Sequence, residues 1–237
     1  MLVLAHRGAN RLALENTVAA MAAAVDLGAD GVELDVHRTA DGVLVVRHDA
    51  QTADGPIGEL TLSALQSVQP EVPVLAAVLD VCRGRLVNVE VKDSDPRAAE
   101  ALVALLAGRS AGAHEDVVDE VLVSSFDVAT VDRVRAAAPH LPTGFLSFGL
   151  PPDDALAIAI DHGHTAVHPD VWTLLQVDVP EFVTRAHDLG LQVNVWTVND
   201  PLQVEQLRDA GVDAVITDDE QLYAFGDRRG DVRGRPR

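Results

Sequence analysis

The sequence is poor in cysteine and contains no long hydrophobic run. Its 237 residues include one cysteine, Cys82, which cannot form an internal disulfide and therefore agrees with a reducing compartment. No apolar stretch reaches the ~20 residues that a membrane-spanning helix requires. The first polar motif, HRG at residues 6–8, comes too early for a secretory signal of about 15 to 30 residues. These absences predict a cytoplasmic protein without a stable membrane anchor.

Positive charge is also scarce. The chain has 18 Lys and Arg residues against 37 Asp and Glu residues, and its formal net charge is −19. Because binding a nucleic-acid backbone requires a basic surface, this composition argues against a nucleic-acid partner. An anionic ligand must then be small and locally neutralised. The only lysine is Lys92, and this hints that a compact positive charge is needed there.

Short β-rich segments alternate with Ala- and Leu-rich helical stretches along almost the whole chain. This alternation is typical of βα units around a parallel sheet, and a hydrophobic content of 48% is enough for one large core. We expect residues 1–225 to form one domain and residues 226–237 to be a flexible basic tail; the oligomeric state is left open. Eight predicted strands indicate a (β/α)₈ TIM barrel, and they lie at residues 2–6, 31–36, 86–91, 120–125, 143–147, 165–168, 192–197 and 213–217.

Helix boundaries between these strands have recognisable signals. A helix over 16–27 ends before Gly28, and one over 180–189 ends before Gly190. A third, over 201–210, begins with Asp200 as its cap and Pro201 in its first turn.

A ninth β-rich segment, residues 43–47, follows the second strand too closely for a parallel crossover. It is therefore expected to form an antiparallel hairpin that turns at Asp41-Gly42, as a short cap insertion after the second strand. Counting down both arms of this hairpin places His48 about opposite Glu33.

Charged residues interrupt the apolar pattern at the ends of the early strands. Residues two apart on a strand share a face, so Glu33 lies with Asp35, and Glu90 with Lys92. Active sites of TIM barrels lie at the carboxyl ends of the strands, where Glu33, Asp35 and Glu90 would repel one another without a cation. Oxygen ligands without cysteine favour one divalent cation, Mg²⁺ or Ca²⁺. The alternative is that these acids pair with arginines or cap helices.

His6 and His48 are the candidate proton carriers, because each ends a strand near the same rim. Arg7 and Lys92 are the candidate phosphate contacts, and their alternative is internal pairing with nearby glutamates. The remaining histidines are interpreted as structural residues in loops or on helices: His37, His114, His140, His162, His164 and His187. His168 is a weaker candidate for the rim.

Several further residues border the predicted site. Asn16 is first interpreted as a helix cap, and Glu15 as a group that orients Arg7 or His6. Trp196 shares a strand face with Asn194 and is a candidate pocket wall together with Phe126, although core packing explains these side chains equally well.

These motifs resemble those of the glycerophosphodiester phosphodiesterase family. The resemblance runs in unbroken order from His6 to about Asp218, through HRG, ENT, GADGVELDV, TADGVLVVRHD, NVEVK, VSSF, VWTVN and GVDAVITD. It implies a TIM barrel with His6 and His48 as the acid/base pair and Glu33, Asp35 and Glu90 as metal ligands. It also implies phosphate contacts by Arg7 and Lys92, with Glu15, Asn16 and Trp196 bordering the site.

The expected reaction is hydrolysis of a small-molecule glycerophosphodiester to an alcohol and glycerol 3-phosphate. The sequence departs from the family pattern at Leu14, where a proline usually precedes ENT, and after His48, where the segment is short and lacks an Arg-Thr-Thr type stretch. We therefore expect a small cap. The alternatives are a lysophospholipase D-like activity and a noncatalytic phosphoester-binding barrel. The attacking group, either water or a substrate hydroxyl that forms a cyclic phosphate, is left open.

Overall fold

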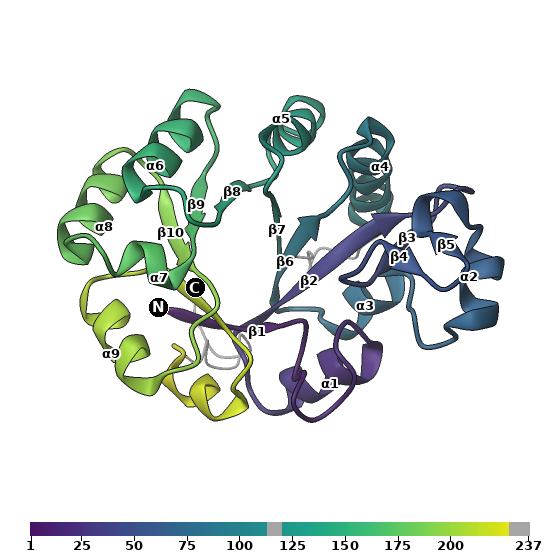
Figure 1. The fold of residues 1–237 in the computed structure, drawn as a ribbon, viewed down its shortest axis with the longest axis horizontal. Coiled ribbons are helices and arrows are strands. Elements are labelled where there is room, and N and C mark those ends of the chain that lie inside the picture. Colours follow the sequence, from purple (N-terminus) through teal and green to yellow (C-terminus); the bar gives the residue numbers. More distant parts are fainter. Residues whose placement is uncertain (113–119, 228–237) are drawn as a thin grey trace.

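Eight parallel strands form a closed ring in the computed structural model, which describes residues 1–112 and 120–227 (Figure 1). β1 pairs with both β11 and β2, and this double pairing closes the ring. The predicted (β/α)₈ barrel is therefore confirmed. In order around the ring the strands are β1 (Leu2–His6), β2 (Gly31–Arg38), β6 (Leu86–Val91), β7 (Glu120–Ser125), β8 (Thr143–Ser147), β9 (Ala166–Pro169), β10 (Gln192–Val195) and β11 (Ala214–Thr217).

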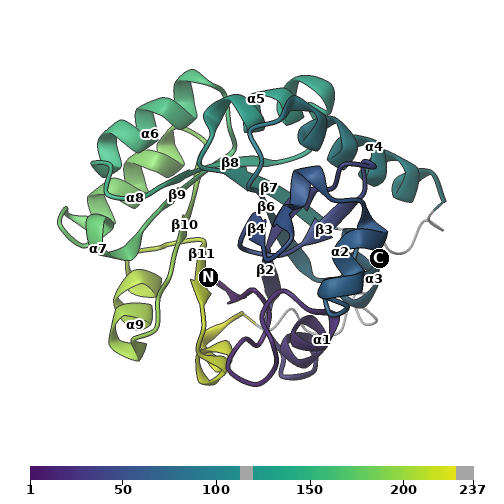
Figure 2. The ribbon, with the colours of Figure 1, turned by 45° about the vertical axis from the view of Figure 1, so that its right-hand side comes forward.

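Helices surround this ring of strands, as Figures 1 and 2 show. The α-helices are α1 (Val18–Asp26), α2 (Leu62–Val68), α3 (Leu75–Val81), α4 (Pro96–Gly112), α5 (Val128–Ala137), α6 (Pro152–Asp161), α7 (Val171–Leu174), α8 (Val179–Asp188) and α9 (Pro201–Asp209). Two short 3-10 helices, η1 (Ile57–Glu59) and η2 (Glu220–Phe225), complete the set. No helix within the described ranges is long and apolar enough to cross a membrane.

Side-chain caps fix where several helices begin. Asp200 accepts a hydrogen bond from the backbone N–H of Leu202, as predicted for α9. At the start of α8, Asp178 accepts from the backbone N–H of Glu181. The interpretation of Asn16 as the cap of α1 is wrong, because Thr17 holds that position and accepts from the N–H of Ala20. Asn16 has a left-handed backbone with φ of 58°, whereas the capping residue has extended backbone.

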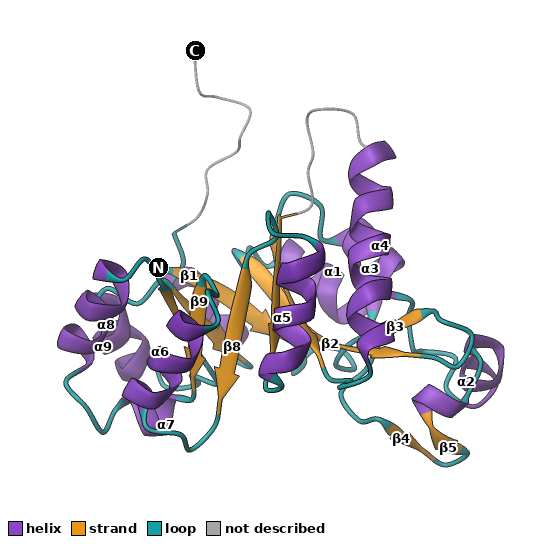
Figure 3. Ribbon diagram, turned by 90° about the horizontal axis from the view of Figure 1, so that it is seen from above, coloured by secondary structure: helices purple, strands orange, loops and turns teal. Residues whose placement is uncertain are grey.

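The predicted hairpin is present. β3 (Leu44–Val46) runs antiparallel to β2 beyond the point where β2 leaves the ring, and Gly42 makes the turn with φ of 89°. Two very short strands, β4 (Gln51–Thr52) and β5 (Gly55–Pro56), follow it. Figure 3 shows them at the end of the barrel toward which the arrowhead of β8 points. The hairpin and α2 have a small core of their own, made of Val45, Ile57, Leu65 and Val72.

The main core fills the space between the strands and the helices. Fully buried side chains such as Met21 on α1, Leu102 on α4 and Phe182 on α8 pack against it. Each Å² of apolar surface that is removed from water stabilises the fold by about 25 cal/mol, and this holds the helices against the ring. The barrel is thus a rigid frame that fixes the strand ends. Most of the predicted tail at residues 226–237 lies outside the described residues, as does His114.

Candidate active site

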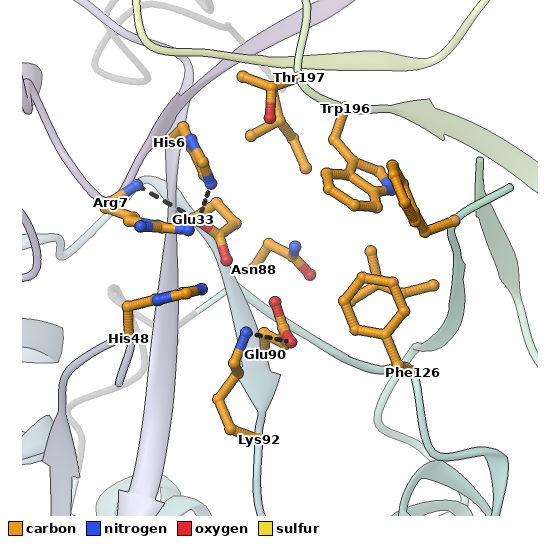
Figure 4. A pocket seen from close by; sticks show the side chains of 13 residues that line it. His6, Arg7, Glu33, His48, Asn88, Glu90, Lys92, Phe126, Trp196 and Thr197 are labelled. Carbon is orange, nitrogen blue, oxygen red and sulfur yellow. Dashed lines mark hydrogen bonds and ion pairs between the residues drawn. The ribbon is translucent and has the colours of Figure 1, made fainter. Parts of the chain in front are cut away.

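A cavity of about 560 Å³ opens at the carboxyl ends of the strands (Figure 4). One side of it is charged and the other is apolar. Its lining residues are His6, Arg7, Glu33, His48, Asn88, Glu90, Lys92, Phe126, Leu146, Phe148, Trp196, Thr197 and Ile216. The strand ends therefore bring most of the predicted site residues together in one cavity.

Three buried carboxylates meet beside this cavity. In the parallel register Asp35 is paired with Glu90, and Glu33 lies two residues before Asp35 on the same face. One oxygen from each of the three groups lies within 4.8 Å of the others. Burial raises the pKa of Glu33 well above its ordinary value, and repulsion from Asp35 and Glu90 raises it further. Burial and the charge of Asp35 likewise raise the pKa of Glu90.

Two basic side chains offset part of this negative charge. Lys92 Nζ lies 3.0 Å from Glu90 Oε1 and 3.3 Å from Asp35 Oδ1. Arg7 Nε lies 3.3 Å from Asp35 Oδ2, and Arg7 Nη1 lies 3.1 Å from Glu15 Oε2. Burial alone would raise the pKa of Asp35, but Lys92 and Arg7 together hold it below its ordinary value.

The internal pairing considered for Arg7 and Lys92 is thus present, and both side chains also line the cavity. Among the described residues, the three buried carboxylates nevertheless outnumber these two permanent cations: Glu33, Asp35 and Glu90. A buried excess of negative charge on hard oxygen atoms is the environment that a divalent cation neutralises. The residues present therefore fit such an ion.

His6 is held by a carboxylate from the far end of the chain. Its Nδ1 lies 2.7 Å from Oδ1 of Asp218, just after β11, while its Nε2 lies 3.8 Å from Oε2 of Glu33. Asn10 and Asn199 donate hydrogen bonds to Asp218 at 2.6 and 2.8 Å. Burial would raise the pKa of Asp218, but the bond from His6 and these amides hold it far below its ordinary value. Asp218 thus remains ionised and fixes the orientation of the imidazole.

His48 reaches the cavity from the segment that follows β3. Its Nδ1 lies 2.8 Å from Oδ1 of Asp49, and Figure 4 shows its ring on the same side of the cavity as His6, with Arg7 between them. The carbonyl of His48 lies 3.1 Å from Nε2 of His37, whose Nδ1 lies 2.7 Å from Asp93. Placing His37 in a loop or helix was wrong, because it is a buried residue of β2 that supports the backbone of His48.

Asn16 and Glu15 support the charged side of the cavity. Asn16 Nδ2 donates to Asp35 Oδ2 at 2.8 Å, and Asn16 Oδ1 accepts from the N–H of Asp35 at 3.3 Å. Glu15 accepts hydrogen bonds from Arg7 Nη1 at 3.2 and 3.1 Å, so Arg7 is the one of its two predicted partners that it orients. Both residues act on the site through the side chains that they hold.

The opposite side of the cavity is an aromatic wall made of Phe126, Phe148 and Trp196. The rings of Phe126 and Trp196 meet edge to face with centroids 5.4 Å apart, and Phe148 lies 6.1 Å from Trp196. Trp196 Nε1 donates to the carbonyl of His168 at 3.0 Å, which fixes the indole. His168 itself is fully buried and lies 3.0 Å from Asn194, so the weaker prediction of a rim position for His168 is wrong.

Asn88 is a lining residue that the sequence analysis did not single out. It lies on β6 two residues before Glu90 and is fully buried, yet neither its amide nitrogen nor its amide oxygen has a hydrogen-bond partner among the described residues. Buried amides are almost always satisfied, so this side chain is available to a ligand or ordered water in the cavity. Its spacing from Glu90, which puts both on one strand face, was the available signal.

Comparison with known proteins agrees with this geometry. The family model described as "Glycerophosphoryl diester phosphodiesterase family" matches residues 6–222. The chain belongs to this family. A glycerophosphodiester phosphodiesterase of Caldanaerobacter subterraneus subsp. tengcongensis is 31% identical, over 97% of this chain and 98% of the relative.

Solved structures of the family share the fold. A glycerophosphodiester phosphodiesterase from Thermotoga maritima superposes with a TM-score of 0.80 at 25% identity, over 95% of this chain and 97% of that one. A phosphodiesterase from Oleispira antarctica, solved with sn-glycerol-3-phosphate as product, gives a TM-score of 0.80 at 24% identity, over 95% and 96% of the two chains. At that identity the second likeness shows the fold alone.

The comparisons do not favour the lysophospholipase D-like activity or the noncatalytic barrel. The small predicted cap corresponds to β4, β5, η1 and α2, which lie beside the hairpin (Figure 3).

Proposed function

We propose that His6 and His48 exchange the protons in the hydrolysis of a glycerophosphodiester to an alcohol and glycerol 3-phosphate. The reaction is that of the family, and the enzyme is a phosphoric diester hydrolase. The single observation that carries the residue roles is the convergence of two imidazoles on one cavity beside three buried carboxylates. Two proton carriers allow one to act as base and the other as acid.

Glu33, Asp35 and Glu90 would hold one divalent cation, Mg²⁺ or Ca²⁺. Their geometry and their unbalanced charge support this proposal, as does the general dependence of the family on divalent metals. When bound, such an ion polarises a phosphoryl oxygen and stabilises the negative charge that develops on it.

The two histidines differ in how they are held. His6 uses Nδ1 to contact Asp218, which leaves Nε2 directed toward the carboxylates and available for proton transfer. His48 contacts Asp49 through Nδ1, and 37% of its side chain is exposed, so it stands nearer the mouth of the cavity. This arrangement serves an attack by water or by a neighbouring hydroxyl of the substrate, since either nucleophile needs one base and one acid.

The phosphate would lie against Arg7 and Lys92, whose charges face the cavity from its anionic side. Trp196 would wall the bound alcohol, together with Phe126 and Phe148. The amide of Asn88 would bond a substrate hydroxyl or an ordered water, which would satisfy its two unpartnered atoms. Glu15 and Asn16 position Arg7 and Asp35 and do not themselves touch substrate.

The partner is proposed to be a small molecule and not a nucleic acid, because the formal net charge of −19 would repel a polyanion. A cytoplasmic location is proposed on the single cysteine. Residues 1–225 are proposed as one catalytic domain.

The experiment that tests this function is hydrolysis by a metal-free preparation to which each cation is restored in turn. Glycerophosphocholine, glycerophosphoethanolamine and a lysophospholipid form the substrate panel. We expect metal-dependent release of alcohol and glycerol 3-phosphate from the first two. Turnover of the lysophospholipid alone would change the substrate class, and absence of turnover with every cation would refute the enzymatic proposal.

A further inference from the structure

A second group of metal-ligand side chains lies away from the catalytic cavity. Asp132 is on α5, and His162 and His164 lie between α6 and β9. One ligand atom from each residue lies within 4.8 Å of the other two. Because His164 precedes β9 and contacts the first residue of β8, the group is at the amino ends of the strands, opposite the catalytic cavity.

The three side chains are already arranged around a common point. His162 Nδ1 lies 2.8 Å from Oδ2 of Asp132, and His164 Nε2 lies 3.5 Å from Oδ1 of the same carboxylate. The two imidazole rings are nearly parallel, with 10° between their planes and 6.0 Å between their centroids. Nitrogen and oxygen ligands about 2.0 to 2.2 Å from a tetrahedral ion are separated by roughly 3.3 to 3.5 Å, so only small rotations are needed.

The nitrogen of His164 that faces Asp132 has no hydrogen-bond partner in the part of the chain that the structure describes, although none of the side chain is exposed. Its other nitrogen, Nδ1, lies 3.0 Å from the hydroxyl of Thr143. A ligating histidine commonly donates its second ring N–H to a neighbouring oxygen in this way, which turns the lone pair of Nε2 toward the metal. In the tautomer that donates from Nδ1, the lone pair of Nε2 faces a carboxylate oxygen of Asp132, and a cation between the two atoms would make this contact favourable.

Arg135 is a nearby cationic side chain, and its charge opposes metal binding. Its Nη2 lies 2.8 Å from the position that a Cβ at Gly163, between the two histidines, would take. Its side chain is exposed and is able to swing into solvent.

We propose that Asp132, His162 and His164 form a second metal site, one for a transition metal such as Zn²⁺. Two imidazoles and one carboxylate favour Zn²⁺ over the Mg²⁺ or Ca²⁺ proposed for the all-carboxylate cluster. Water would fill the remaining coordination position. The ion would join α5 to the segment before β9, so its effect is on the stability of this part of the barrel and not on the phosphodiester reaction.

Zn²⁺ binding to His162→Ala tests the site, with His187→Ala as the matched control. His187 is also partly exposed and also contacts an aspartate at 2.8 Å, but it belongs to no group of three ligands found among the described residues. Zn²⁺ is titrated against a chromophoric chelator, and thermal unfolding is followed with and without Zn²⁺. The catalytic carboxylates are the same in all the proteins, so differences between them report only the second site.

We expect the wild type and His187→Ala to bind one more Zn²⁺ per chain than His162→Ala, with an affinity loss on the order of 100-fold at this site in His162→Ala. Asp132→Asn should behave like His162→Ala, which guards against a folding defect in one variant. Co²⁺ in place of Zn²⁺ should give a visible absorption band in the wild type and His187→Ala that His162→Ala and Asp132→Asn lack. Equal Zn²⁺ stoichiometry, affinity and thermal shift in all four proteins would refute the site, even if both variants were less stable without metal.

Discussion

The charge imbalance at the carboxylate cluster makes a prediction for Glu33→Gln, a change that keeps the shape of the side chain and removes its charge. Glu33 is buried within 4.8 Å of two other carboxylates. At an effective dielectric constant of about 20, each such pair repels by about 3.5 kcal/mol when both groups are ionised, and Arg7 offsets part of this energy. The metal-free variant should therefore be more stable than metal-free wild type, by on the order of 2 kcal/mol.

The pH dependence has a definite sign. The pKa of Glu33 is raised in the folded state above its ordinary value of 4.5, so its stabilising protonation is complete below that value. It is lost as the pH rises through the folded pKa. The metal-free wild type should thus lose stability toward alkaline pH, and Glu33→Gln should lose less. The gain in melting temperature at pH 8 should be roughly 4 to 8 °C for a domain of this size.

The assay is thermal unfolding in a chelator and then in Mg²⁺ or Ca²⁺. A cation at 100 times its Kd stabilises the wild type by about 2.7 kcal/mol, and this gain should largely disappear in Glu33→Gln. The variant should therefore be the more stable protein without metal and the less responsive one with it. Glu205→Gln, a change at an exposed glutamate, is the control. A metal-free Glu33→Gln protein that is less stable than wild type, yet gains as much from the cation, would refute the reasoning.

Three further predictions concern the histidines and Asp218. His6→Ala and His48→Ala should each lower kcat by on the order of 10²-fold or more at unchanged folding, and unaltered turnover in steady-state kinetics would end the acid/base proposal. Asp218→Asn should lower kcat more than it changes KM, because it loosens the 2.7 Å contact that orients His6; a pure KM effect would contradict this. Burial lowers the pKa of His168 to about 3 from 6.5, so stability should fall as the pH drops through that window, by about 5 kcal/mol. His168→Gln should flatten denaturant-derived stability between these pH values, and an equally steep slope in the variant would contradict the assignment.

Local patterns in the sequence predicted the barrel and much of the cavity. Runs of residues that favour β-structure predicted each strand. The two-residue spacing of Glu33 with Asp35, and of Glu90 with Lys92, predicted that the members of each pair lie on the same face of their strand. The short link before residues 43–47 forced the antiparallel hairpin that brings His48 to the cavity. These features depend on short stretches of chain, which is why the sequence alone was sufficient.

Long-range and depth-dependent features were not predictable in the same way. Asp218 contacts His6 although 212 positions separate them in the sequence, and the residues around neither of them predict this contact. Asn16 has the sequence context of a helix cap, but its amide donates a hydrogen bond to the buried Asp35, and Thr17 caps the helix instead. The sequence pattern placed His168 on a strand but could not show how deeply its side chain is buried, and that side chain lies inside the barrel.

A crystal structure with Mn²⁺ and glycerol 3-phosphate would test the central claim most directly, because the anomalous scattering of Mn²⁺ locates the ion independently of its ligands. The account predicts one strong anomalous peak within about 2.0 to 2.6 Å of oxygens from Glu33, Asp35 and Glu90. It also predicts that the phosphate lies beside this peak, within hydrogen-bond reach of His6 and His48. A peak away from these carboxylates, or a phosphate outside the reach of both imidazoles, would contradict it.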